Sequence, residues 1–431
     1  MTMNPNRLSE LSRRQFAARA ASAALGVGLL PVDRLFAAGE GASKARHPNA
    51  KAKNVIYLYM AGGMSHLDTF DPKPGNEVMG STTTLATGID DYHVGSGLRR
   101  TAALMDRFAV VNSMYSTQGA HEQGNYYMHT SYTLRGTIRH PAMGGWLLKF
   151  NGKGNPTLPG SVVIGDGSRH PGGGFFESKF SPLMINNPEQ GLQNSARKET
   201  VSETAFNRRL DMARHLDAPF HEAFPQKNVR AYRDLYDEAL SLMKSEDLKA
   251  FDIASEPAAV RERYGDDNFG QGCLLARRLV QHGVRFVEVS LGRWDTHVNN
   301  FVEVPERCDI LDRGLSALVQ DLEANGMLED TLIVLASEFG RTPKINGNEG
   351  RDHYPKAFTT LLAGGGVKGG TVYGKTDEEG AEVVENKVSV PDLNATIGYA
   401  LGLPLDQVLY SPSKRPFTVA DKGQPITALF G

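Results

Sequence analysis

The sequence contains little cysteine, no surplus of one charge and no long apolar segment. Its 431 residues include only two cysteines, Cys273 and Cys308, whose spacing fits no zinc-binding pattern, so a thiolate metal site is excluded. They are either buried thiols or, in an oxidising compartment, a disulfide. Basic and acidic residues number 47 and 49, a balance that lacks the basic footprint of nucleic-acid-binding proteins. The sequence is instead rich in glycine, with 46 residues, and has 12 histidines.

The first 39 residues are typical of an export signal rather than of a folded domain. Arg13 and Arg14 precede Phe16, the apolar run 20–30 follows, and small residues occupy 37–39. This run is shorter than the roughly 20 residues that span a membrane. The paired arginines resemble the twin-arginine type of signal. We therefore expect the twin-arginine translocation machinery to carry the chain, already folded, to a periplasmic or secreted location.

Short apolar runs that alternate with helical patterns predict an α/β fold. The runs are residues 55–60, 108–114, 161–164, 286–291, 332–337 and 359–363. Their continuous hydrophobicity is typical of a parallel sheet that is covered on both faces. Helical periodicity appears in residues 231–244, 270–282 and 308–325. We expect one α/β domain over residues 50–431, with a mostly helical insertion near 186–249 and a hairpin or exposed loop over 372–390.

Polar residues follow four of these predicted strands, at the sheet edge where open α/β folds bind ligands. They are His66 and Asp68 after the first run, His121 after the second, Asp295 and His297 after the fourth, and Glu338 and His353 after the fifth. Imidazoles with carboxylates bind zinc, manganese or iron, and carboxylates alone also suit magnesium or calcium. The sequence therefore predicts a site for a divalent metal ion, whose identity stays open.

Spacing divides these candidates into two groups. Asp295 and His297 point the same way if their segment is extended, and Glu338 and His353 would complete their shell. The other group would contain His66, Asp68 and His121. Arg341 and Lys73 are candidates for holding an anion that the metal also contacts. Structural roles remain alternatives: Asp68 is also suited to capping a turn, and His129 to a structural role on a helix.

Several longer motifs resemble a known family of exported bacterial proteins, the domain of unknown function 1501 family. They are GGMSHLDTFDPKP, HEQGNYYMHTS, WDTHVNNF, SEFGRTPKINGNEGRDHYP and LAGGGVKGGTVYGKTDEEG. That family looks like a divergent branch of the alkaline phosphatase and sulfatase superfamily. LMDRFAVVNSMYSTQGAHEQGNYYMHTS is similar to the stretch that leads into the sulfatase nucleophile, and VPDLNATIGYALGLP to the last core helix. The resemblance implies an alkaline phosphatase-like three-layer sandwich with a mostly parallel central sheet and helices on both faces.

The resemblance also implies metal-dependent hydrolysis of phosphate or sulfate esters. The superfamily's nucleophile falls at His121, which either attacks the ester or binds metal, and His353 fits the last metal histidine. Two positions depart from the pattern: Ala61 stands where a metal-binding aspartate ends the first strand, and Glu338-Phe339 stands where an Asp-His pair is usual.

Two hypotheses follow. The first is an exported hydrolase of small-molecule or polysaccharide esters. Its catalytic residues would be His121 and Arg341, and its metal ligands His66, Asp68, Asp295, His297, Glu338 and His353. The second is a non-catalytic cell-envelope protein that binds a sugar, an anion or a partner on a degenerate hydrolase fold. Neither hypothesis involves nucleic acid or a transmembrane span.

Overall fold

The computed structural model describes residues 50–431, apart from 194, 196, 225 and 226, so the predicted export signal lies outside the described residues. A nine-stranded sheet forms the centre, in the order β12-β4-β11-β8-β1-β7-β5-β6, with β15 also paired to β4. Its strands are β1 (Asn54–Met60), β4 (Phe108–Tyr115), β5 (Ser161–Ile164), β6 (Leu183–Ile185), β7 (Phe286–Leu291), β8 (Thr331–Ala336), β11 (Phe358–Ala363), β12 (Thr371–Tyr373) and β15 (Val388–Ser389). All six runs predicted as strands are strands of this sheet.

Strand direction brings four strand ends to one edge. The pairings of β1 with β7 and β8, and of β5 with β6 and β7, are parallel. Only β11 is antiparallel, and it is so to both neighbours, β4 and β8. Two reversals restore the direction, so β4 runs the same way as β8. The carboxyl ends of β1, β4, β7 and β8 therefore lie at the same edge of a mixed, mostly parallel sheet.

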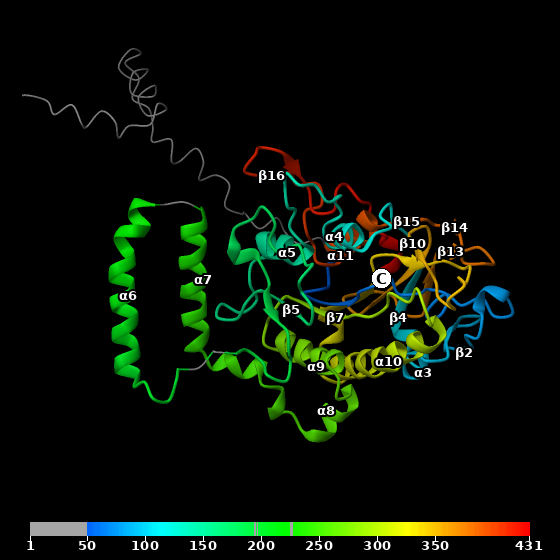
Figure 1. The fold of residues 1–431 in the computed structure, drawn as a ribbon, viewed down its shortest axis with the longest axis horizontal. Helices are drawn as coiled ribbons and strands as arrows, with labels where there is room; N and C mark the ends of the chain where they lie inside the picture. The colour runs from blue at the N-terminus through cyan, green and yellow to red at the C-terminus, as the bar shows by residue number, and fades with distance from the viewer. Residues whose placement is uncertain (1–49, 194, 196, 225–226) are drawn as a thin grey trace, which may run out of the picture. The chain divides into compact units, whose positions relative to one another are not determined.

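Helices cover both faces of the sheet, as predicted (Figure 1). α9 (Asn268–Gln281) and α10 (Asn300–Ala324) lie on one face. α4 (His121–Thr130), α5 (Met143–Asn151) and α11 (Val390–Ala400) lie on the other. Alternate residues of β1 belong to different cores, because successive strand side chains point to opposite faces. Ile56, Leu58 and Met60 pack in the core that contains α9 and α10, whereas Val55, Tyr57 and Tyr59 pack in the other core.

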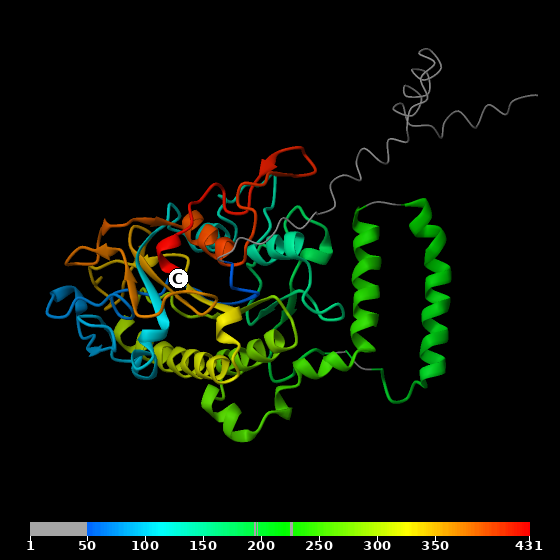
Figure 2. The ribbon, with the colours of Figure 1, turned by 180° about the vertical axis from the view of Figure 1, so that it is seen from behind.

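The remaining elements are peripheral to this sandwich. The segment 186–249 contains two long helices, α6 (Glu203–Ala223) and α7 (Lys227–Met243), which lie side by side in both views (Figure 1 and Figure 2). The others are α3 (Arg99–Ala102), α8 (Ala258–Tyr264), and the strand pairs β2 (Thr84–Ala86) with β3 (His93–Gly95), β9 (Gly340–Arg341) with β10 (His353–Tyr354), β13 (Lys375–Thr376) with β14 (Val383–Glu385), and β16 (Leu409–Tyr410) with β17 (Pro416–Phe417).

Three sequence expectations meet the structure here. The stretch 372–390 contains the β13–β14 hairpin, while its ends extend into β12 and β15 of the main sheet. Cys273 and Cys308 are buried free thiols. None of the described helices combines the length and the apolar character that crossing a membrane requires.

Candidate metal centre

Three strand ends deliver a cluster of imidazoles around one carboxylate. His121 begins α4 after β4, Asp295 and His297 follow β7, and His353 lies in β10 after β8. β10 is held to β9 in antiparallel register, with His353 opposite Arg341, so the loop that follows β8 turns back to the sheet edge. Asp295, His297 and His353 lie together as predicted, whereas His121 joins them instead of the predicted group with His66 and Asp68.

Asp295 is the centre of the cluster. Its Oδ2 lies 3.2 Å from Nε2 of His121, and its Oδ1 lies 3.2 Å from Nε2 of His297 and 3.3 Å from Nε2 of His353. The ring centroid of His353 lies 4.3 Å from that of His121 and 4.7 Å from that of His297. The side chains of Asp295 and His297 are 46% and 42% exposed, so the cluster is open to solvent.

The opposite nitrogen of each ring contacts a hydrogen-bond acceptor. Nδ1 of His121 lies 2.8 Å from Glu338, Nδ1 of His297 lies 2.8 Å from Asp352, and Nδ1 of His353 lies 2.9 Å from the carbonyl of Gly119. A carbonyl or carboxylate only accepts, so each Nδ1 carries the proton. A ring that is otherwise neutral then presents the lone pair of its Nε2, and a doubly protonated ring donates from Nε2 to Asp295.

This arrangement fits a metal ion. A lone pair facing a carboxylate oxygen at about 3.2 Å is unfavourable unless a proton or a cation lies between them. Nε2 of His121 is buried and has no hydrogen-bond partner among the described residues. The ligand atoms of His121, Asp295 and His353 all lie within 4.8 Å of one another. Metal-binding histidines usually donate their other N–H to a carboxylate or carbonyl, as these three do.

Glu338 lies behind His121 rather than in the cluster. One carboxylate oxygen accepts from His121 and from the Gly62 N–H at 2.9 Å, and the other accepts from the Tyr59 hydroxyl at 2.9 Å and from Ser337 at 3.3 Å. Both of its carboxylate oxygens are therefore engaged by protein donors. The geometry suits Glu338 to orienting His121, whereas the sequence predicted it as a ligand.

Gly62 allows this packing. Its φ is +119°, and a Cβ at this position would lie 2.7 Å from the backbone nitrogen of Asp295. Any larger residue would therefore separate the loop after β1 from the loop after β7.

Arg341 is buried beneath Asp295. Its guanidinium donates to Asp295 at 2.6 Å, to the carbonyl of Gly63 at 2.8 Å, to the carbonyl of Arg351 at 3.0 Å and to the carbonyl of Gly62. With its donors directed at protein oxygens and its side chain inaccessible, Arg341 is suited to fixing Asp295. The predicted anion contact of Arg341 would require some of these bonds to be replaced. Lys73, the other anion candidate, is paired with Asp71 at 2.8 Å.

The charges of the cluster reinforce one another. Burial opposes the ionisation of Asp295, but the hydrogen bond and charge of Arg341 outweigh it and lower the pKa of Asp295 to about 2. Burial likewise opposes the ionisation of Glu338, whose pKa is nevertheless lowered by the hydrogen bond from His121. The same bond raises the pKa of His121, whereas burial lowers that of His353. Both carboxylates are therefore anionic at neutral pH.

The structure does not bring His66 and Asp68 to this cluster. His66 is fully buried, its Nε2 lies 2.8 Å from the carbonyl of Gly380, and burial lowers its pKa to about 4. Asp68 is buried in an ion pair with Arg351 at 2.8 Å and accepts further bonds from Ser65, Thr82 and Asn300. Both follow β1 as predicted, but they contact Gly380 and Arg351 instead of the Asp295 cluster.

A second histidine–carboxylate group, which the sequence reasoning missed, is buried in the core. Glu288 in the middle of β7 lies 3.1 Å from Nε2 of His129 and 3.5 Å from Nε2 of His170. Nδ1 of His129 faces the carbonyl of Asn125 at 2.7 Å, but Nδ1 of His170 accepts the Gly172 N–H at 3.0 Å. The sequence signal for this group was Glu288, a charged residue inside the apolar run 286–291. Asp352, directly before His353, was also available and missed.

The architecture and the cluster together define a class of protein. This is an α/β protein with a mostly parallel sheet, and its fold resembles structures of the alkaline phosphatase and sulfatase superfamily. The chain belongs to the family described as Protein of unknown function (DUF1501), whose profile matches residues 52–430. The family resemblance that the sequence motifs predicted is thereby confirmed. No curated protein matches the chain.

Solved structures with a similar fold are distant in sequence. The lipoteichoic acid synthase LtaP from Listeria monocytogenes is 10% identical, with 84% of this chain and 76% of that chain covered and a TM-score of 0.41. The PsFucS1 sulfatase from Pseudoalteromonas sp. is 13% identical, with coverage of 87% and 74% and a TM-score of 0.39. A protein of the alkaline phosphatase superfamily from Vibrio parahaemolyticus is 11% identical, with coverage of 86% and 74% and a TM-score of 0.35.

Proposed function

We propose that this protein is an exported, metal-dependent hydrolase of phosphate or sulfate esters, with one metal ion bound by His121, Asp295, His297 and His353. The observation that carries the proposal is that three imidazole Nε2 atoms face Asp295 while their Nδ1 atoms are each fixed by an acceptor. Three imidazoles favour zinc, manganese or iron over magnesium and calcium, which prefer oxygen ligands.

The chain's own residues would divide the work as follows. Glu338 and Asp352 hold two rings by their Nδ1 atoms, and Arg341 holds Asp295. When bound, the metal ion would neutralise the ester oxygens and lower the pKa of a water molecule. The exposed side of Asp295 and His297 leaves room for the ester to approach from solvent. The choice of phosphate and sulfate esters rests on the sequence motifs described above.

Elemental analysis of natively exported protein tests the proposal. We expect one equivalent of a transition metal ion, and chelator-sensitive hydrolysis of p-nitrophenyl phosphate or p-nitrophenyl sulfate. His353→Ala should remove both the metal and the activity, whereas His215→Ala, on exposed α6, should change neither. Protein that holds no metal, or whose ester cleavage survives His353→Ala, would reject the proposal.

A second candidate is a non-catalytic binding protein of the cell envelope. The favouring observations are Ala61 at the end of β1, where a ligand aspartate is expected, and the engagement of the Arg341 donors by protein oxygens. A metal-loaded protein that binds phosphate or sulfate and turns over no ester of either kind would favour this candidate.

Export by the twin-arginine route is part of the proposal. It rests on Arg13 and Arg14 and on the short apolar run after them. Replacing both arginines by lysine should leave the protein in the cytoplasm, as fractionation and immunoblotting would report. Export that continues unchanged would contradict this route and leave the hydrolase proposal standing.

A further inference from the structure

Helix α6 carries an exposed apolar stripe. Met212, Leu216 and Phe220 follow one another at intervals of four residues, Phe224 comes directly after the last helical residue, and the exposed fractions of the four are 59%, 71%, 54% and 47%. Residues four apart lie on the same face of a helix, so these side chains form one continuous surface. Leu210 is the one buried residue of α6 among the described residues. The helix therefore presents its apolar face to solvent.

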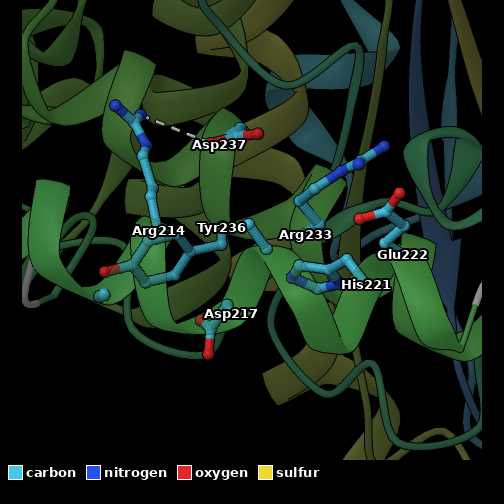
Figure 3. Close-up of a pocket in the computed structure, with 9 residues that line it drawn as sticks. Arg214, Asp217, His221, Glu222, Arg233, Tyr236 and Asp237 are labelled. Atoms are coloured by element: carbon cyan, nitrogen blue, oxygen red, sulfur yellow. Dashed lines mark ion pairs between the residues drawn. The ribbon is translucent and has the colours of Figure 1, made fainter.

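The contact between α6 and α7 does not cover the stripe. The two helices enclose a groove of about 520 Å³, and the side chains that line it are mostly polar (Figure 3). From α6 the groove receives Ala213, Arg214, Asp217, Ala218, His221 and Glu222. Arg214 pairs with Asp237 of α7 across it at 3.5 Å. None of the four stripe residues lines this groove, so the polar face of α6 is turned to α7.

An uncovered stripe of this size is unusual. Helix stability in proteins comes mostly from packing of an apolar face, and an isolated helix has little stability of its own in water. Contiguous apolar surface on a soluble protein generally marks an interaction site. The occupant of the stripe should carry charges that complement those beside it.

We propose that the stripe is a homodimer interface, in which α6 pairs antiparallel with α6 of a second copy. Ala213 is the midpoint of the helix. Arg209 and Asp217 each lie four residues from this midpoint, on opposite sides of it. A full-length antiparallel pairing therefore sets Arg209 level with Asp217 of the second copy, twice by symmetry.

The same antiparallel register also brings apolar residues of the two copies together. Phe206 and Phe220 each lie seven residues from Ala213, so Phe206 of one copy comes level with Phe220 of the other. Arg209 lies on the stripe face, three residues before Met212. Asp217, next to Leu216 in sequence, lies between the stripe and the groove to α7, which it also lines. Both are exposed. A parallel pairing would instead set Arg209 beside Arg209 and Asp217 beside Asp217 of the second copy, so like charges would meet.

The charge balance of α6 favours a second copy over an anionic membrane or a nucleic acid. The helix contains Arg208, Arg209 and Arg214 but four acidic residues, Glu203, Asp211, Asp217 and Glu222. Its charges are self-complementary rather than basic, and an anionic surface would be repelled by the acidic residues. The dimer does not depend on the proposed function, because the stripe and the metal centre share no residue.

Sedimentation velocity on the purified full chain tests this inference. We expect a dimer whose dissociation constant rises about a hundredfold in Leu216→Glu. Arg209→Asp and Asp217→Arg should each weaken the dimer about tenfold, because each sets like charges opposite one another. The double variant should restore the dissociation constant to within about threefold of the wild-type value. Asp211→Arg, an equal charge change away from the stripe, should have no effect.

The charge variants keep the test decisive if Leu216→Glu fails to fold, which circular dichroism would reveal. A wild-type chain that stays monomeric up to its solubility limit would overturn the inference. So would a double variant as weak as the single ones. A monomer that binds phosphatidylglycerol vesicles would overturn it too, and would assign the stripe to a membrane surface.

Discussion

The molecule holds two groups of histidines around a carboxylate, and they differ in where the protons are. Around Asp295, every Nδ1 faces an acceptor, so a neutral ring at each position can offer the lone pair of its Nε2 to a metal ion. Around Glu288, Nδ1 of His170 accepts an N–H, so its Nε2 carries the proton and faces Glu288 at 3.5 Å. His129 faces acceptors at both nitrogens, which the doubly protonated ring satisfies.

The Asp295 cluster can bind an added cation, whereas the Glu288 group contains its own cation, a protonated histidine. An imidazolium at His129 neutralises Glu288, and burial of the group leaves no open side. A metal ion at Nε2 of His170 would require a ring with no proton on either nitrogen. The same residue types thus occur in two settings, and the N–H that Nδ1 of His170 accepts is the contact that distinguishes them. Four changes would break or sharpen this contrast.

The largest effect is expected from Glu288→Ala. Removing the carboxylate leaves a buried imidazolium without its partner, which costs about 3–5 kcal/mol in the free energy of unfolding. Urea denaturation followed by circular dichroism measures this change. Asp352→Ala is the matched control and should cost less than about 1 kcal/mol, because this carboxylate also contacts a histidine but its side chain is 57% exposed. Equal losses in the two variants would erase the proposed distinction.

His170 should make the free energy of unfolding depend on pH. Burial lowers its pKa to about 4, so between this value and its unfolded pKa of about 6.5 the unfolded chain binds more protons. Stability should therefore fall as the pH drops through this window, by up to about 3 kcal/mol from this residue. His170→Asn should flatten the slope in urea titrations at several pH values. An unchanged slope would mean that His170 does not titrate in this way.

His129 acts in the opposite direction. Burial lowers its pKa, but the charge and hydrogen bond of Glu288 outweigh burial and raise the pKa above its usual value. Its contribution to stability is therefore complete below about pH 6.5 and is lost as the pH rises through the folded-state pKa. Together the two histidines place the optimum near neutral pH.

Glu338→Gln should weaken metal binding about 10–100-fold with the fold intact. An amide at this position cannot accept all the hydrogen bonds that the carboxylate receives from His121, Gly62, Tyr59 and Ser337, so the His121 ring is held less firmly. Competition against a chelator of known affinity measures the change. Unaltered affinity would show that orientation by Glu338 contributes nothing.

The smallest effect is expected from Asp352→Ala. This carboxylate holds Nδ1 of His297 at 2.8 Å, but its side chain is 57% exposed, so water can replace it. The same chelator competition should give a loss of less than about tenfold. A loss larger than that of Glu338→Gln would reverse the order proposed for the two supporting carboxylates.

The sequence was sufficient for six of the nine strands of the sheet and for three residues of the cluster. Continuous apolar runs mark buried strands, and parallel strands gather their carboxyl ends at one edge, so Asp295, His297 and His353 could be expected to meet, whereas His121 was expected beside His66 and Asp68. Strand direction is not encoded in hydrophobicity, so the reversal of β11 could not be read from its apolar run.

The rest of the site depends on contacts across the chain. His66 and Asp68 also follow a strand, yet Asp68 forms an ion pair with buried Arg351, and His66 contacts the carbonyl of Gly380. Those partners lie about 300 residues away, and no local pattern pairs them. The role of Glu338 likewise depends on Tyr59, Gly62 and Ser337 occupying its oxygens. Residue type suggests that a group can bind metal, whereas its hydrogen-bond partners decide whether it is free to do so.

The reversal of β11 has a consequence for how the molecule can vary. Because β11 starts at the edge where β8 ends, the chain between them can leave and return without crossing the sheet. That single excursion bears Glu338, Arg341, Asp352 and His353. Insertions or exchanges within it would reshape the opening above Asp295 while the strands stay in register, so substrate preference among related chains should change most readily there.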